Sequence, residues 1–179
     1  FNGETFTKEE IIEALAWATR RGEVAPVFCG SALDLSGVDQ LLNGLMWLAP
    51  WAETVAGEIG ETPDGEPVEL VVDEDQPTAA IVFKTVVDPF VGKISYLKVM
   101  SGVLNSDSQV YNANKDANEK IAQVYVINGK FQNGVGKLFT GDIGAVVKLQ
   151  NTQTNDTLCT SSKVVHYEPI NFPKPMLGY

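Results

Sequence analysis

The sequence predicts a mainly β chain, in which a small closed antiparallel β-barrel follows a small α/β segment. Between Ala79 and Cys159, short apolar strands are interrupted about every dozen residues by Gly, Asn, Asp and Ser, as in small all-β barrels. Before residue 50, two stretches carry apolar residues at helical spacing and enclose one short apolar run. Helix, strand, loop and helix in that order are typical of the last part of an open α/β sheet.

The first helix is predicted over residues 7–21. Thr7 and Glu10 have the spacing of a capping box at its start. Gly22 follows the last turn, where a glycine can adopt the left-handed conformation that ends a helix. The apolar face consists of Ile11, Ile12, Leu15 and Ala18, and Arg20 and Arg21 complement the helix dipole.

A short buried strand is predicted over residues 24–29, with Pro26 favouring an edge or a strand start. Gly30-Ser31-Ala32 follows, and a second helix is predicted from Val38 to Leu48. Ser36 and Asp39 have capping-box spacing at its start, and Pro50 ends it.

Residues 51–77 are rich in glycine, proline and acidic residues, so we expect an exposed connector. One short strand is predicted around Val68–Val72, followed by a solvated turn at residues 73–75. The expected domain limits are 1–50 for the α/β segment, 51–77 for the acidic connector, 78–162 for the barrel and 163–179 for an extended linker.

Within the barrel, residues 81–87 are apolar on both faces, which predicts an outer wall partly covered by another domain or partner. In residues 93–100 the apolar parity changes between Tyr96 and Leu97, which predicts a β-bulge. The loop 128–136, with three glycines, is expected to be the most adaptable. Further strands are predicted at Ser108–Ala113, Lys120–Ile127 and Ile143–Leu149.

Composition limits the classes of function. No run of 18 apolar residues is present, so no membrane span is expected. Cys29 and Cys159 are predicted to be buried free thiols in a reducing cytoplasm, and the lone His166 is expected to bind no metal. Residues 1–75 hold three basic and sixteen acidic side chains, whereas 76–179 hold ten and seven. The barrel half alone is mildly basic, which fits either an RNA-facing surface or ordinary surface charge.

The order of several short motifs points to a family. Residues 3–50 contain Gly3-Glu4, Thr7 and Glu10, then Val27-Phe28-Cys29-Gly30-Ser31-Ala32, Gly37-Val38 and Leu48-Ala49-Pro50. The barrel adds Phe83-Lys84, Asp88-Pro89-Phe90-Val91-Gly92-Lys93, Ser101-Gly102-Val103-Leu104, Gly141-Asp142-Ile143 and Asp156-Thr157-Leu158-Cys159. In this order they resemble a translational GTPase of the elongation factor G type, from the end of its GTP-binding domain through its second domain.

This resemblance implies a translation-factor-type β-barrel (domain II) preceded by a fragment of a P-loop GTPase domain and followed by a linker towards domain III. It implies that Gly30, Ser31 and Ala32 form the loop under the guanine base. The parent protein would use GTP and Mg²⁺ to move tRNA and mRNA through the ribosome in the cytoplasm. Its barrel would contact small-subunit ribosomal RNA and brace the GTP-binding domain, with no role for DNA or a membrane. Candidate RNA contacts are Lys93, Lys98, Lys115, Lys120, Lys130 and Lys137.

Several GTPase motifs are absent from residues 1–179. There is no G-x-x-x-x-G-K-[ST] for the phosphates, and no Asp-x-x-Gly for the γ-phosphate switch. Residues 114–117, Asn-Lys-Asp-Ala, resemble the base-reading N-K-x-D, but the acid falls one position early and a hairpin turn is expected there. We therefore expect this chain alone to have no catalytic residue, to bind neither GTP nor metal, and to be inactive as an enzyme.

Two alternatives stay open at this stage. The chain opens on Phe1 rather than Met, which fits a part of a longer protein. It could instead be a stand-alone protein-interaction β-barrel module, in which case residues 1–50 should have a buried core of their own. Within the same family, the parent could also act in ribosome recycling, release or protection from antibiotics.

Overall fold

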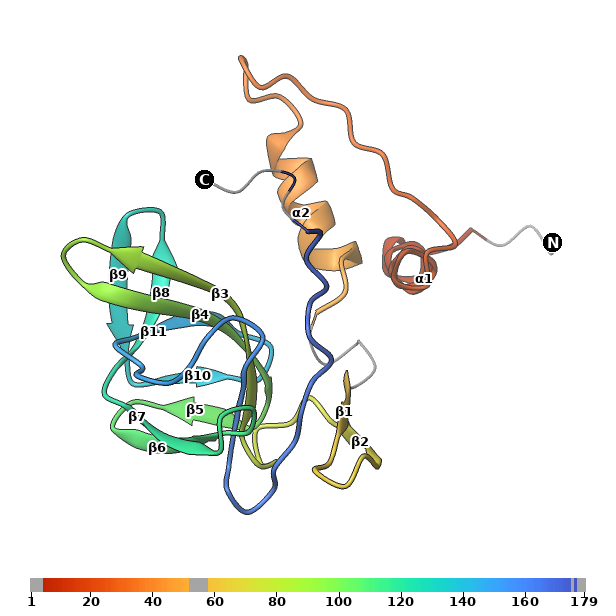
Figure 1. Ribbon diagram of the computed structural model, residues 1–179. Coiled ribbons are helices and arrows are strands. Elements are labelled where there is room, and N and C mark those ends of the chain that lie inside the picture. The colour runs from red at the N-terminus through yellow and green to blue at the C-terminus, as the bar shows by residue number, and fades with distance from the viewer. Residues whose placement is uncertain (1–4, 52–57, 175, 177–179) are drawn as a thin grey trace. The chain divides into compact units, whose positions relative to one another are not determined.

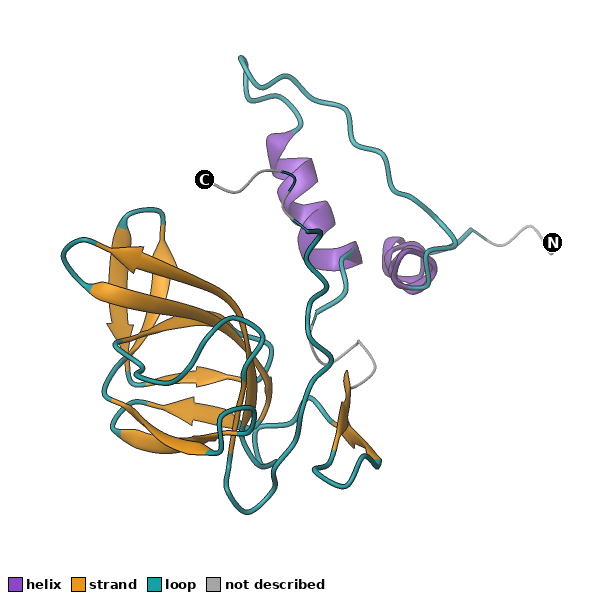
Figure 2. Cartoon of the chain, in the orientation of Figure 1, coloured by secondary structure: helices purple, strands orange, loops and turns teal. Residues whose placement is uncertain are grey.

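The computed structural model describes residues 5–51, 58–174 and 176. The chain divides into two compact units, Phe1–Val55 and Ala56–Tyr179. The described helices belong to the first unit and the described strands to the second (Figures 1 and 2). The predicted mainly β fold class, with a small helical segment in front, is confirmed.

Helix α1 (Lys8–Arg20) begins and ends as its sequence predicts. The Thr7 hydroxyl accepts a hydrogen bond from the Glu10 amide (3.2 Å), and the Glu10 carboxylate accepts one from the Thr7 amide (2.8 Å). Past the C-terminus, Gly22 has φ +72°, and its N–H donates to the Thr19 carbonyl (3.0 Å). The Glu23 N–H donates to the Ala18 carbonyl (2.9 Å), which completes a Schellman motif.

Helix α2 (Val38–Leu48) has the predicted bounds, but the predicted capping box is wrong. The N-cap is Gly37 at φ +79°, and no side chain caps the helix. Ser36 lies one residue too early for its side chain to reach the first helical amides. At the other end, Ala49 is extended, as the residue before Pro50 must be.

The strand predicted at residues 24–29 does not form, and the expected burial of Cys29 is also wrong. The segment is a loop, Val27 is 87% exposed and Cys29 is exposed. A strand is stabilised by pairing, and no neighbouring strand in the described part of this unit pairs with the segment. Instead the Phe28 ring packs directly on helix α2, because Gly44 has no side chain at that point.

The second unit is built on one curled antiparallel sheet (Figure 1). Its order is β7-β6-β12-β3-β4-β11-β8-β9. The strands are β3 (Ala79–Asp88), β4 (Gly92–Ser101), β6 (Ser108–Asn112), β7 (Ala117–Ile121), β8 (Val124–Asn128), β9 (Phe131–Val135), β11 (Ile143–Val147) and β12 (Thr157–Cys159). Two antiparallel pairs accompany it: β5 (Val103–Asn105) with β10 (Lys137–Phe139), and β1 (Glu58–Glu61) with β2 (Pro67–Leu70). Among the described residues, no ladder joins β7 to β9, so the predicted closure of the barrel stays a prediction.

Three local predictions in this unit need correction. The strand predicted over 120–127 is two strands, β7 and β8, separated by residues 122–123 and placed towards opposite ends of the sheet order. The loop predicted over 128–136 contains strand β9, and of its three glycines Gly134 lies opposite Tyr125 of β8. The acidic connector contains the β1–β2 hairpin, with Leu70 buried.

The predicted β-bulge is confirmed at Tyr96 and Leu97, although the extra residue lies on the opposite strand. Val82 pairs with Leu97 and Lys84 pairs with Tyr96, which leaves Phe83 of β3 without a partner residue. A second irregularity leaves Met100 of β4 unpaired, because successive residues of β3 pair with residues 101 and 99. Bulges bend a strand and redirect one side chain.

Two hydrophobic clusters hold this unit together. The larger lies inside the curled sheet and consists of Ala80, Val82, Leu97, Val99, Leu104, Val110, Ile121, Val124, Leu138, Val146, Leu149 and Leu158. The smaller consists of Leu70, Ala79, Met100, Cys159, Val165 and Tyr167, drawn from the sheet, β2 and the segment after β12. The outer wall is therefore covered in part by flanking segments of this same chain, and not only by another domain or partner as predicted.

Candidate functional site

In the first unit, the predicted loop of Gly30, Ser31 and Ala32 closes through two glycines. The backbones at Gly30 and Gly37 pass so close that a Cβ on Gly30 would lie 2.6 Å from the Ser36 carbonyl oxygen. A Cβ on Gly37 would lie 2.4 Å from the Cys29 carbonyl oxygen. Real Cβ atoms do not approach backbone oxygens this closely, so only glycine fits at these two positions.

Ser31 fixes the shape of the loop by three hydrogen bonds. Its N–H donates to the Ser36 carbonyl (2.9 Å), and its hydroxyl donates to the Asp34 carboxylate (3.0 Å). The same hydroxyl accepts from the Asp34 N–H (3.3 Å). Within the described residues, the N–H of the exposed Ala32 donates to no hydrogen bond and is available to a ligand.

All three predicted residues line one pocket of about 220 Å³. Its other walls are Phe28, Cys29, Gly37, Val38 and Leu41. The volume is below the roughly 300–1,000 Å³ of typical ligand pockets, so the pocket suits one ring system rather than a whole nucleotide. An apolar wall beside a free backbone donor is what a planar heterocycle with a carbonyl oxygen requires.

Three of the six predicted RNA-contact lysines have contacts within the chain. The ammonium of Lys93 donates to the carbonyls of Gln150 (3.1 Å) and Thr152 (2.9 Å). Lys115 lies 4.0 Å from the Asp156 carboxylate, and Lys137 lies over the Phe139 ring at 4.3 Å. Lys93 therefore has a structural role at a loop, which reduces its value as a phosphate contact.

The remaining three lysines have no ion pair among the described residues. Lys120 on β7 and Lys130 in the β8–β9 turn are exposed. Lys98 on β4 is half-buried and lines a groove on the outer face of the sheet. Of the predicted set, Lys120 and Lys130 are the two most accessible to an external phosphate without loss of an internal contact.

A buried carboxylate, Glu119, was not among the predicted site residues. It is only 4% exposed and accepts hydrogen bonds from the amides of Gln150 (3.1 Å), Asn151 (2.6 Å) and Thr152 (2.9 Å). The Thr152 hydroxyl donates to it as well (3.0 Å). The sequence contains a signal for the burial of Glu119. It lies two residues before the buried Ile121 on β7, so both side chains point to the same face of the strand. Its partners all lie within the protein, so its role is to hold the loop at 150–152.

The pKa values of Asp88 and Cys159 are shifted from their ordinary values. Backbone hydrogen bonds from Val91 and Phe90 lower the pKa of Asp88 at the β3–β4 turn. Burial raises the pKa of the Cys159 thiol, which keeps it protonated and makes it a poor nucleophile. The hairpin turn predicted at residues 114–117 forms one residue earlier, at 113–116, and there the Tyr111 hydroxyl donates a short hydrogen bond of 2.5 Å to Asp116.

The described helices include none that is long and apolar enough to cross a membrane. His166 lies in an extended segment and exchanges two backbone hydrogen bonds of 2.8 Å with Glu61 of β1. That pairing attaches the segment after β12 to β1.

Comparison with known proteins identifies the second unit. Residues 77–161 match the family model for elongation factor G domain 2. The chain also resembles the crystal structure of ttk003000868 from Thermus thermophilus, with a TM-score of 0.70 and 25% sequence identity. That similarity covers 96% of this chain but only 24% of the Thermus chain, so it includes both units and spans about a quarter of the larger molecule. The resemblance to elongation-factor-G-type translational GTPases predicted from the sequence is confirmed.

Proposed function

Through residues 77–161 this chain belongs to the elongation factor G family, and from that premise we propose its function. We propose that the chain is part of a ribosome-dependent GTPase that promotes translocation of tRNA and mRNA. The observation that carries the proposal is the family match over the whole curled sheet. Because the chain spans about a quarter of the Thermus structure, GTP hydrolysis and translocation would belong to the larger protein, acting in the cytoplasm.

In this proposal the loop of Gly30, Ser31 and Ala32 forms one edge of the guanine site. The Ala32 N–H would donate to the base oxygen, and the close passage of Gly30 and Gly37 would keep the loop open to the ring. The phosphates and Mg²⁺ need a P-loop and a metal-binding Ser or Thr, which residues 1–179 do not supply. Those groups would therefore come from other parts of the protein.

The second unit would dock on small-subunit ribosomal RNA and brace the GTP-binding domain. Lys120 and Lys130 are the residues best placed for phosphate, since both are exposed and have no internal ion pair in the described part of the chain. Lys93 would act indirectly, by holding the 150–152 loop.

One observation weighs against the alternative of a stand-alone interaction module. That alternative requires a complete core in the first unit, yet its described residues bury only Ala16, Gly44 and Leu48. On helix α2, the apolar side chains of Leu42 and Met46 are 57% and 72% exposed. Helices with such bare apolar faces are stable when something covers them. Recycling, release and antibiotic protection remain alternative tasks within the family.

Cosedimentation of the chain with purified 30S subunits at several salt concentrations tests the ribosome-facing role. We expect binding that weakens steeply with salt, and about tenfold weaker binding by the double variant Lys120→Glu/Lys130→Glu with a shallower salt dependence. The matched control is Lys163→Glu/Lys174→Glu, which makes the same change of net charge elsewhere. Equal loss in both variants, or no binding by the unmodified chain, would contradict the assignment.

A nucleotide titration tests whether the groups that bind the phosphates lie outside residues 1–179. Isothermal titration calorimetry of the chain with GTP or GDP is expected to show no measurable binding, because no phosphate loop is present. Micromolar affinity for either nucleotide would show that the loop of Gly30, Ser31 and Ala32 is not merely one edge of the site.

A further inference from the structure

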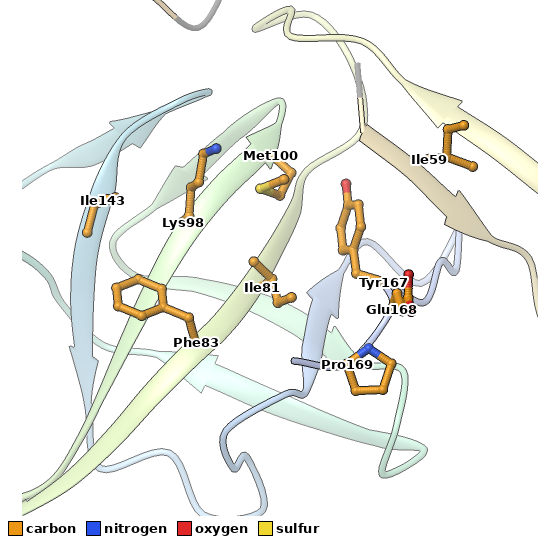
Figure 3. A pocket seen from close by; sticks show the side chains of 9 residues that line it. All are labelled: Ile59, Ile81, Phe83, Lys98, Met100, Ile143, Tyr167, Glu168 and Pro169. Atoms are coloured by element: carbon orange, nitrogen blue, oxygen red, sulfur yellow. The ribbon is translucent and has the colours of Figure 1, made fainter. Parts of the chain in front are cut away.

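A groove of about 510 Å³ lies on the outer face of the sheet in the second unit (Figure 3). Its volume falls within the roughly 300–1,000 Å³ range of ligand-binding pockets. The wall consists of Ile59, Ile81, Phe83, Lys98, Met100, Ile143, Tyr167, Glu168 and Pro169. Six of these nine side chains are aliphatic, aromatic or thioether groups with no charge and a seventh is proline, so the groove is mainly apolar.

The floor follows from strand register. Ile81 of β3 pairs with Lys98 of β4, and Lys98 pairs with Ile143 of β11, so the three lie side by side on one face. Phe83 and Met100 are the two residues left unpaired by the register irregularities of β3 and β4. Both line the groove, so each bulge redirects a large apolar side chain into its wall.

The opposite wall comes from segments that flank the sheet and lie outside residues 77–161. Ile59 belongs to β1, and Tyr167 follows His166, whose backbone pairs with Glu61 of β1. The Tyr167 N–H donates to the Thr157 hydroxyl (3.1 Å), which attaches this wall to β12. The groove is therefore a feature of this chain beyond the matched domain, with both walls held by hydrogen bonds.

The groove contains both exposed apolar side chains and charged side chains that form no ion pair in the described part of the chain. Ile59 is 68% exposed and Ile143 is 59% exposed, whereas Met100 in the same groove is buried. Lys98 lies near Ile143, and Glu168 lies across the groove beside Tyr167 and Pro169, with Ile81 and Met100 between Lys98 and Glu168 (Figure 3). In the described residues neither Lys98 nor Glu168 forms an ion pair. An apolar trough thus has a cation at one end and an anion at the other.

We propose that this groove docks a short segment of a partner polypeptide, in which apolar side chains lie between a carboxylate and a cation. The apolar residues would cover Ile81, Met100 and Ile143, the carboxylate would pair with Lys98, and the cation with Glu168. Complementary charges at the rim would set the orientation of the segment. This inference concerns a surface that the proposed GTPase role does not use.

The same observations disfavour RNA as the occupant. A phosphate chain is bound by several cations along its path, whereas the groove has one lysine and a carboxylate that would repel phosphate.

The test is an NMR titration of the ¹⁵N-labelled chain with two capped peptides, Glu-Leu-Phe-Leu-Lys and Lys-Leu-Phe-Leu-Lys. We expect the amides of Ile81, Lys98 and Ile143 to shift with the first peptide, and to respond roughly fivefold more weakly to the second. In Lys98→Glu this preference should reverse. Lys148→Glu, with the same charge change at an exposed position outside the groove, should keep the original preference.

Ile143→Asp is the second variant, and it should abolish the shifts from both peptides while the spectrum remains that of a folded protein. Absence of shifts in the groove with either peptide would overturn the proposal. Groove shifts caused by a single-stranded uridine decamer but not by the peptides would overturn it in favour of RNA. Shifts that follow the concentration of the chain alone would assign the groove to a second copy.

Discussion

At the residue scale, Glu119 is a buried carboxylate with four hydrogen bonds inside the protein. It accepts from three consecutive backbone amides and one hydroxyl, in a nearly buried site. In Glu119→Gln, one oxygen acceptor becomes an NH₂ donor that faces N–H donors. We expect a loss of about 1–3 kcal/mol in the free energy of unfolding, measured by urea denaturation followed by circular dichroism.

The control for this variant is Glu69→Gln, which makes the same chemical change on an exposed residue of β2. It should change stability by less than about 0.5 kcal/mol. Equal stability of the two variants would show that the amides at 150–152 are satisfied without the Glu119 charge.

Asp88 gives a prediction for pH. Its carboxylate accepts from the Phe90 and Val91 amides (2.8 and 2.9 Å), and these bonds lower its pKa from the ordinary value of 3.8. A group with a lowered pKa stabilises the folded turn above its unfolded pKa, and that stabilisation disappears as the pH falls through the folded pKa. We therefore expect the β3–β4 turn to loosen only below about pH 3.8.

Amide shifts of Phe90 and Val91, followed from pH 6 to pH 2 or thereabouts, measure this effect. Both should titrate together with a midpoint below 3.8. Asp88→Asn keeps an acceptor oxygen and should show no such titration. A midpoint above 3.8 in the unmodified chain would contradict the role given to these hydrogen bonds.

At the scale of elements, predictions succeeded where the determining signal is local in sequence. The capping box of Thr7 and Glu10 and the C-terminal Gly22 depend on residues within a few positions, and α1 has the predicted ends. The strand at 24–29 failed because its burial depends on neighbouring strands that the described part of its unit does not offer. The cap of α2 failed because the Ser31–Ser36 pairing gives the loop its own hydrogen bonds and places Gly37 at the N-cap.

The prediction at the scale of elements concerns Gly37, the N-cap of α2. Gly22 and Gly37 both have positive φ, but a Cβ on Gly22 would meet nothing within 4 Å, whereas one on Gly37 would collide with the Cys29 carbonyl. Gly22→Ala should therefore cost only the left-handed strain of about 1–2 kcal/mol. Gly37→Ala should cost about 1–3 kcal/mol more, because the loop must also move.

Unfolding in urea, monitored by tryptophan fluorescence, compares the two variants, because Trp17, Trp47 and Trp51 all belong to the first unit. If Gly37→Ala is no less stable than Gly22→Ala, the close passage of the two backbones is not what holds the pocket of Gly30, Ser31 and Ala32.

At the scale of the whole molecule, the family and the mainly β class were predictable because the motif series runs through both units in order. Phe83 and Met100 show what was not predictable. The parity change at Tyr96 and Leu97 predicts a bulge, but which strand contributes the extra residue depends on pairing across strands. The coverage of the outer wall likewise depends on a hairpin and a C-terminal segment that are distant in sequence from the strands they cover.

The two units differ in how much apolar surface they bury, and this leads to the last prediction. The second unit contains two clusters of buried residues, whereas the described part of the first buries very few side chains and leaves Trp17 57% exposed. Stability rises with the apolar area buried, so the first unit should unfold at a lower urea concentration.

All five tyrosines belong to the second unit and all three tryptophans to the first, so each unit has its own probe. Tryptophan fluorescence should change first, and near-ultraviolet dichroism in the tyrosine region should change later. A single coincident transition would mean that the two units stabilise each other enough to unfold as one.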